Sequence, residues 1–189
     1  LLDEKLLSEV SGKAIIVKNK IFEPYGFASV FSKKKTKDIS SGIIPNKKKQ
    51  SFVEKAMLWI RGNIFIPDAR IFWVKPSILF LRKYLVENNI DTVITTGPPH
   101  SLHLIGLQLK KEMHINWITD FRDPWTTIGY HKELKLSNWA AKTHKNLEKE
   151  VLNNCDSIIV TSPTTKKEFE VITSKPISVI TNGYDVEKS

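Results

Sequence analysis

Residues 92–119, TVITTGPPHSLHLIGLQLKKEMHINWIT, place two short apolar segments on either side of a segment with helical spacing. Thr92–Thr95 and Ile115–Thr119 predict buried strands, and the leucines and isoleucine between them predict a helix from about Pro99 to Lys111. A helix that joins two strands returns the chain to the same end of a sheet, so the strands run parallel. Continuously apolar strands are typical of parallel sheets covered on both faces.

The same alternation continues to the end of the chain. Ser157–Val160 and Ile177–Ile180 predict two more strands. Ser137 is expected to cap a long helix, and Ser162 with Pro163 is expected to begin a shorter one. The expected inward faces of these helices carry Trp139, Thr143, Leu147 and Val151 in the first, and Phe169 and Ile172 in the second.

Helical patterns precede residue 92. Ser51 and Glu54 form a capping box before a helix that ends at Gly62-Asn63, and a second helix is expected from about Pro76 to Asn88-Asn89. Ala14–Val17 predicts a further short strand. These elements together predict an α/β fold, a Rossmann-like parallel sheet with helices on both faces.

Length and composition fit one globular domain. The chain has 189 residues, of which 41% are hydrophobic and 26% charged. Residues 1–50 are rich in lysine and loop-forming residues, whereas 51–189 carry the regular α/β pattern. No apolar run reaches the roughly 18 residues of a membrane-spanning helix. The single cysteine, Cys155, cannot form an internal disulfide, which fits a reducing compartment.

The net charge of +9 is concentrated near the start of the chain. Residues 1–50 contain eleven lysines and five acids, a net of +6. Such a segment attracts polyanions, either nucleic acid or an anionic membrane, or it is simply a solvated loop. No aromatic residue is interleaved and arginine is absent before Arg61, so nucleic acid is not an expected partner. Most of the excess comes from Lys33, Lys34, Lys35, Lys37, Lys47, Lys48 and Lys49.

Ligands of parallel sheets bind outside the carboxyl ends of the strands, so the loops that leave the strands are the candidate site. The first loop contains Gly97, Pro98, Pro99, His100 and Ser101. Glycine permits a sharp turn and the prolines stiffen it. At the start of a helix, His100 suits a phosphate or a sugar hydroxyl, although it could also serve only to hydrogen-bond a neighbouring loop.

The second loop, Asp120-Phe121-Arg122-Asp123-Pro124-Trp125, carries two acids around one arginine. The acids suit sugar hydroxyls, Arg122 suits an anion, and Trp125 suits the face of a sugar ring. An internal clamp between Arg122 and the acids is the alternative. In the third loop Ser162 could be only a helix cap, and in the fourth Asn182-Gly183 could be only a turn.

Several familiar sites are missing from the sequence. The glycine patterns of nicotinamide and P-loop sites are absent, as is the G-x-S-x-G pattern of α/β-hydrolases. His100 and His103 have the H-x-x-H spacing, but no third ligand follows at a suitable distance along the chain. We therefore expect no metal and no cofactor.

In their order along the chain, these loops resemble the N-terminal domain of family-four glycosyltransferases of the GT-B fold. The closest likeness is to a bacterial subgroup with G-P-P-x-S and D-F-R-D-P-W motifs, here 97–101 and 120–125. Residues 146–163 and 179–185 also resemble this subgroup. Many members have a histidine where this sequence has Asp120, so the role of that histidine does not transfer.

The resemblance implies a retaining transfer from a nucleotide sugar to a polysaccharide or lipid-linked acceptor, without a required metal. It implies that a first strand precedes Leu1 and that a nucleotide-sugar domain follows Tyr184-Asp185, so we expect residues 1–189 to be an acceptor-side fragment that is inactive alone. It places the enzyme in the cytoplasm, at the inner face of the membrane. The expected catalytic residues are Asp120, Arg122, Asp123 and His100, and the expected substrate-binding residues are Gly97, Pro98, Pro99, Ser101, Trp125, Ser162, Asn182 and Gly183.

Three other functions fit part of the pattern. A nucleotide-sugar epimerase would use the same architecture without forming a glycosidic bond. A basic nucleic-acid-binding domain would use the lysines of residues 33–49 and would bind with a steep salt dependence. A degenerate domain without activity is the third alternative.

Overall fold

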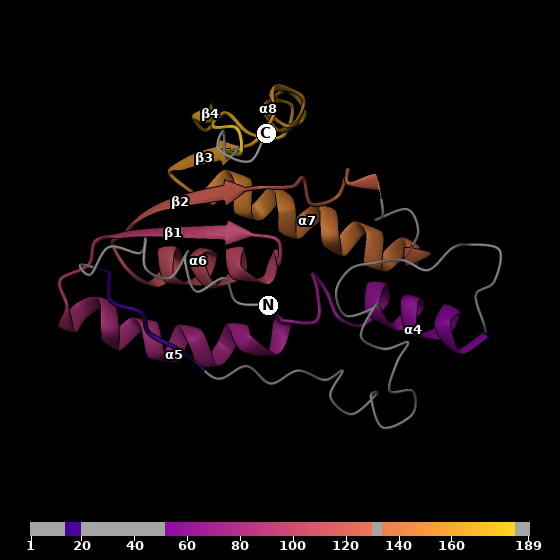
Figure 1. Ribbon diagram of the computed structural model, residues 1–189, viewed down its shortest axis with the longest axis horizontal. Helices are drawn as coiled ribbons and strands as arrows, with labels where there is room; N and C mark the ends of the chain where they lie inside the picture. The colour runs from indigo at the N-terminus through magenta and orange to yellow at the C-terminus, as the bar shows by residue number, and fades with distance from the viewer. Residues whose placement is uncertain (1–13, 20–51, 130–133, 184–189) are drawn as a thin grey trace, which may run out of the picture.

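The computed structural model describes residues 14–19, 52–129 and 134–183 (Figure 1). The helices are α4 (Phe52–Asn63), α5 (Ile71–Glu87), α6 (Ser101–Glu112), α7 (Asn138–Asn154) and α8 (Pro163–Glu170). The strands are β1 (Thr92–Gly97), β2 (Asn116–Phe121), β3 (Ser157–Val160) and β4 (Ile177–Val179). None of the described helices is long and apolar enough to cross a membrane.

The four strands form one parallel sheet in the order β1-β2-β3-β4, so the predicted α/β fold with a Rossmann-like alternation is confirmed. The register aligns the carboxyl ends of the first three strands, because Gly97 pairs with Phe121 and Phe121 pairs with Val160. The loops that leave these strands therefore start side by side. This alignment positions the candidate site.

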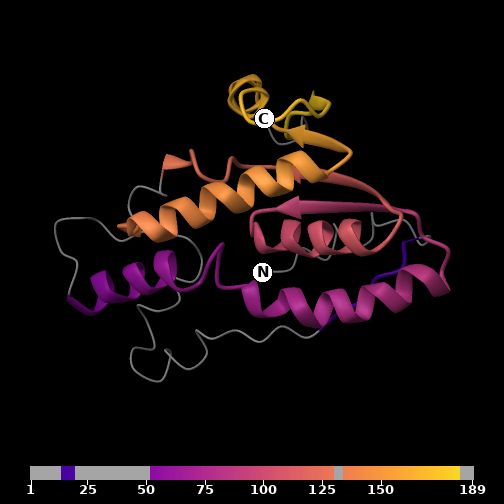
Figure 2. The ribbon, with the colours of Figure 1, turned by 180° about the vertical axis from the view of Figure 1, so that it is seen from behind.

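One face of the sheet packs against the helices. Because every new strand is added on the same side, right-handed crossovers put α6, α7 and α8 on the same face. Figures 1 and 2 show α5 outside α6, at the margin of the molecule. The core between the layers includes Trp117, Phe121, Ile158 and Val160 from the sheet and Leu109, Val151, Leu152 and Phe169 from the helices.

The other face of the sheet is less covered. Ile94 is exposed, and Ile118 and Asp120 are half-buried. The helices that the sequence predicts for this second face are not among the described elements. The predicted Ser51 cap of α4 also lies outside the described residues.

Two expected elements differ in the structure. Ala14–Val17 is not a strand: it has no ladder partner among the described residues, and Ile15 and Ile16 are exposed. An apolar run alone does not make a strand unless it pairs with a neighbouring strand. Helix α5 begins at Ile71 instead of near Pro76, and it includes the proline inside its second turn.

The inward face of α7 agrees in part with the expected one, since Leu147 and Val151 pack in the core. The predicted cap is confirmed, since Ser137 Oγ accepts a hydrogen bond from the Ala140 N–H at 3.2 Å. However, Trp139 is 66% exposed, whereas His144 and Glu148 are buried. The polar side chains can turn inward because distant groups bind them, as the site geometry shows.

Candidate functional site

The loops expected to form the site do meet at the carboxyl edge of the sheet. The Arg122 N–H donates to the Gly97 carbonyl at 2.9 Å, which ties the second loop to the first. The Thr161 hydroxyl donates to the Arg122 carbonyl at 2.9 Å, which ties the third loop to the second. The Ile180 N–H donates to the Val160 carbonyl at 2.9 Å beside the fourth loop. Two backbone hydrogen bonds and the Thr161 hydroxyl therefore hold these loops side by side.

Three charged residues of the second loop are available to a ligand. Asp120 is half-buried, and Arg122 and Asp123 are exposed. Within the described part of the chain, Arg122 forms no ion pair with either acid, so the internal clamp considered above is not observed. Asp120 pairs in register with Thr96, on the sheet face opposite the core. The three charged side chains therefore lie where the carboxyl edge of the sheet meets its less covered face.

His100 and Trp125, by contrast, lie beneath the surface. They are 5% and 1% exposed, and their rings stack with centroids 5.0 Å apart and an interplanar angle of 2°. The Trp125 indole also donates from Nε1 to His144 Nδ1 at 3.2 Å. With its ring covered in this way, Trp125 presents no open face to a sugar in this structure. The stacked pair lies beneath the first two loops and connects them.

Gly97 lies against His100 of this pair and against His103 of α6. A Cβ at this position would come within 2.6 Å of His103 Nε2 and 3.2 Å of His100 Nδ1, so a side chain does not fit. His103 is fully buried, and its Nδ1 lies 2.9 Å from Thr95 Oγ1. Burial lowers the pKa of His103 well below its usual value, and the nearby His100 lowers it further. A neutral His103 therefore packs here as a structural group.

Asp68 organises the start of α6, and the sequence analysis missed it. Its carboxylate accepts from the Ser101 N–H at 2.9 Å and from the Ser101 hydroxyl at 2.8 Å. It also accepts from the Arg70 N–H at 2.9 Å. The helix start that was expected to suit a phosphate thus already holds a carboxylate. The turn residues Pro67-Asp68 before α5 were the available sequence signal.

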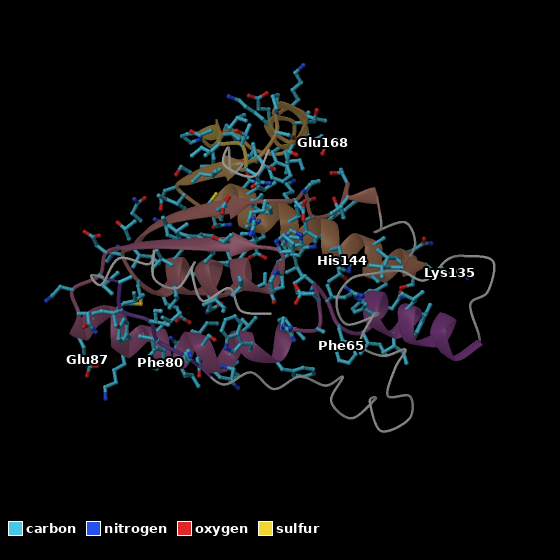
Figure 3. The ribbon with its side chains drawn as sticks, in the orientation of Figure 1. Phe65, Phe80, Glu87, Lys135, His144 and Glu168 are labelled. Atoms are coloured by element: carbon cyan, nitrogen blue, oxygen red, sulfur yellow. The ribbon has the colours of Figure 1, made fainter. Side chains whose placement is uncertain are left out.

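Glu148 and His144 of α7 hold the second loop from below, and they too were missed. The Glu148 carboxylate accepts from the Thr126 N–H at 3.0 Å and from its hydroxyl at 2.6 Å. Burial raises the pKa of Glu148, and the Thr126 hydrogen bonds oppose this. His144 Nε2 lies 3.3 Å from the Gly62 carbonyl, so it donates there while Nδ1 accepts from Trp125. Figure 3 labels His144 on α7.

The remaining predicted site residues differ in how far they are buried. Pro98, Asn182 and Gly183 are exposed, Pro99 and Ser162 are half-buried, and Ser101 is fully buried. Ser162 Oγ accepts from the Thr165 N–H at 3.1 Å, so it is the expected helix cap. Among the described residues, no three histidine, cysteine or acidic side chains are grouped as a metal site requires.

Comparison with known proteins gives one match. Residues 43–188 match the family model described as Glycosyltransferase Family 4. This match spans more than three quarters of the chain and includes all four loops of the site. Neither a curated protein nor a solved structure matches the chain.

Proposed function

Because this chain belongs to glycosyltransferase family 4, we propose that it supplies the acceptor side of a retaining enzyme. The enzyme transfers a sugar from a nucleotide-activated donor to a polysaccharide or lipid-linked acceptor. The observation that carries the proposal is the accessible group Asp120, Arg122 and Asp123 at the edge where the loops meet. Carboxylates beside a guanidinium suit a substrate with sugar hydroxyls and a charged diphosphate.

The three charged residues have separate roles in this proposal. Asp120 and Asp123 accept hydrogen bonds from hydroxyl groups at the reaction centre. Arg122 offsets the negative charge that grows on the diphosphate as the glycosidic bond to it breaks. The interaction of Arg122 is with charge that develops during the reaction, so it accelerates the chemical step itself.

The other predicted residues support or border this group. Gly97 and Pro98 of the first loop form one side of the substrate site, and Pro99 and Ser101 support them. His100 and Trp125 act from beneath, by holding the two loops together. Ser162, Asn182 and Gly183 border the cleft to a second domain, which binds most of the nucleotide sugar. The proposed reaction uses no metal, and residues 1–189 alone do not transfer sugar.

The test measures nucleotide release from a panel of UDP-, GDP- and other nucleotide sugars, using residues 1–189 beside the protein extended to both ends of its reading frame. Release by the extended protein alone supports the proposal and identifies the donor. Asp120→Asn and Arg122→Ala should remove most of this release, whereas Lys149→Ala, which changes an exposed lysine on α7, should not. No release by the extended protein with any donor contradicts the proposal.

The proposed acceptor also implies where in the cell the enzyme acts. A lipid-linked acceptor lies at the inner face of the cytoplasmic membrane, and we propose that the basic chain makes a peripheral contact there. Nucleic acid is not a proposed partner.

A further inference from the structure

The first turns of α7 expose one side that is polar, basic and carries one aromatic ring. Trp139 is 66% exposed, and Lys142 and Lys145 are exposed as well. At 100° per residue, the exposed residues of these turns fall within an arc of about 120°. The opposite side packs inward through Ala140 and His144. We call the five exposed residues the outer face of α7: Asn138, Trp139, Lys142, Lys145 and Asn146.

The positive charge of this face is not compensated within the described structure. Neither Lys142 nor Lys145 forms an ion pair with a described residue, and no acid of α7 lies in the arc. Glu148 is buried on the inner side, and Glu150 pairs with Lys111 of α6. The face therefore offers two cations to an anion that approaches from outside.

A third cation lies at the same end of the helix. Lys135, two residues before the Ser137 cap, is exposed and forms no ion pair with a described residue (Figure 3). Its carbonyl accepts a hydrogen bond from the Asn63 side chain at 3.4 Å, and the Ser137 N–H donates to Asn63 Oδ1 at 2.7 Å. The basic groups therefore project from a backbone that hydrogen bonds hold in place.

The outer face lies close to the candidate site. On the inner side of the same turns, His144 accepts a hydrogen bond from the Trp125 indole, which holds the second loop. Figures 1 and 2 show that this end of α7 extends past the carboxyl ends of β1, β2 and β3. The second loop and the outer face are thus separated by the width of a helix, roughly 10 Å. A chain of sugars that enters the site can continue onto this face.

We propose that the outer face of α7 binds acidic sugar units of the acceptor, beyond the unit that receives the new sugar. An exposed indole packs against the apolar CH face of a sugar ring, amides hydrogen-bond its hydroxyl groups, and lysines pair with its carboxylates. The inference rests on the proposed function and deepens it, because it names the acceptor as an acidic polysaccharide such as a chain of uronic acids.

The composition of the face distinguishes this partner from two other polyanions. A membrane contact needs several apolar side chains that enter the acyl boundary, and this face has only Trp139. Base-specific contact with nucleic acid relies on arginine, and the face contains none. Asparagine carries both a donor and an acceptor, so Asn138 and Asn146 match the hydroxyl groups of a sugar instead.

The test is isothermal titration calorimetry of the 189-residue chain at low salt with three probes. They are an oligogalacturonate, a neutral malto-oligosaccharide of equal length and a polyphosphate of equal charge. We expect the oligogalacturonate to bind at least about tenfold more tightly than the neutral sugar. The assay requires no sugar transfer, so its failure would leave the transferase proposal standing, and a transferase without activity would leave the binding unchanged.

Variants separate the outer face from the overall charge of the protein. Lys142→Ala combined with Lys145→Ala should weaken binding of the oligogalacturonate about tenfold. Lys75→Ala combined with Lys167→Ala removes the same charge from exposed positions on α5 and α8, and this matched control should change binding by less than about twofold. Trp139→Leu should weaken binding of the oligogalacturonate about fivefold but not that of the polyphosphate, which has no ring to pack on an indole. Circular dichroism checks that each variant is folded.

Three results would overturn the proposal. The first is equal binding of the acidic and the neutral oligosaccharide, or no binding of either. The second is an equal loss of affinity in the double variant and in its matched control, because binding would then follow the net charge alone. The third is a loss of polyphosphate binding in Trp139→Leu as large as the loss of oligogalacturonate binding, because the indole would then not recognise a sugar ring.

Discussion

The imidazole of His100 lies parallel to the indole of Trp125, with ring centroids 5.0 Å apart. His100 is the N-cap residue of α6, and Trp125 lies in the loop after β2. One buried contact therefore fixes the relative position of the two loops that carry the candidate site. Substitutions and a change of pH that affect the groups around this contact should change the stability of the protein, whereas a change at the exposed Arg122 should affect activity.

Trp125→Phe should destabilise the protein by about 2 kcal/mol. The change removes the donor of the hydrogen bond to His144 and reduces the buried ring area. Urea unfolding followed by circular dichroism measures the loss. Trp139→Phe is the control, because Trp139 is 66% exposed and should change stability by less than about 0.5 kcal/mol. Equal effects at the two tryptophans would contradict the role given to Trp125.

Gly97→Ala should cost about 1–3 kcal/mol, because its Cβ would lie 2.6 Å from His103 Nε2 in a packed interior. Gly129→Ala is the matched control, since a Cβ at Gly129 meets nothing within 4 Å. His103→Ala opens space at the clash. Combined with Gly97→Ala, it should give less destabilisation than the sum of the two single changes. Additive losses of stability would show that the contact between the new Cβ and His103 is not the cause of the destabilisation.

Asp68→Ala should destabilise the protein by about 1–2 kcal/mol, the usual cost of losing a helix cap. The change leaves the Ser101 N–H and hydroxyl without their carboxylate partner. Thermal unfolding measures the loss, and Asp123→Ala, at an exposed site nearby, serves as the control. Hydrogen exchange should also quicken at the first turn of α6, and unchanged protection there would contradict the cap.

Stability should fall as the pH drops below about 6.5, the pKa of unfolded histidine. Burial lowers the pKa of His103 and His144, so below this pH the unfolded chain binds protons that the folded protein does not. Each histidine then removes up to about 1.4 kcal/mol per pH unit. Burial raises the pKa of Glu148, which takes up a proton first in the folded state and offsets part of the loss.

Urea midpoints between pH 7.5 and 5 measure this dependence. Glu148→Gln removes the offsetting group, so its stability should fall more steeply with acid than that of the unchanged protein. His144→Gln should give a flatter dependence. An increase in stability of the unchanged protein on acidification from pH 7 would contradict the assignment of both histidines as neutral in the fold.

Arg122→Ala should remove most sugar transfer by the extended protein while changing stability by less than about 0.5 kcal/mol, because Arg122 is exposed. If Arg122 acts on the departing diphosphate, kcat should fall more than the KM for the donor changes. Steady-state kinetics with the identified donor separates the two constants. A change in KM alone would indicate that Arg122 only binds the substrate.

The regular part of the fold follows from the sequence because its signals are local. Ser157–Val160 is a strand with the expected bounds, and Ser162 caps α8 as expected. The cap depends only on residues three positions apart, and the strand signal is a local apolar run. Ala14–Val17 has an equally apolar sequence and forms no strand, because a strand also needs a paired neighbour, which no local pattern reports.

The buried residues that support the candidate site could not be predicted from local signals. His144 and Glu148 are polar, and a helical pattern alone assigns such residues to the solvent side. They are buried because Gly62, Trp125 and Thr126 supply hydrogen bonds from distant parts of the chain. Sequence motifs marked the loops of the candidate site, whereas the residues that hold those loops carried no motif of their own.

The order of the strands in the sheet is also their order along the chain. Among the described strands, β2, β3 and β4 therefore each pair with the one synthesised just before it. Contacts between near neighbours in sequence favour fast folding, and chains begin to fold as they leave the ribosome. We expect β1 and β2 to join first. The two motif loops would then be in place before β4 has been made.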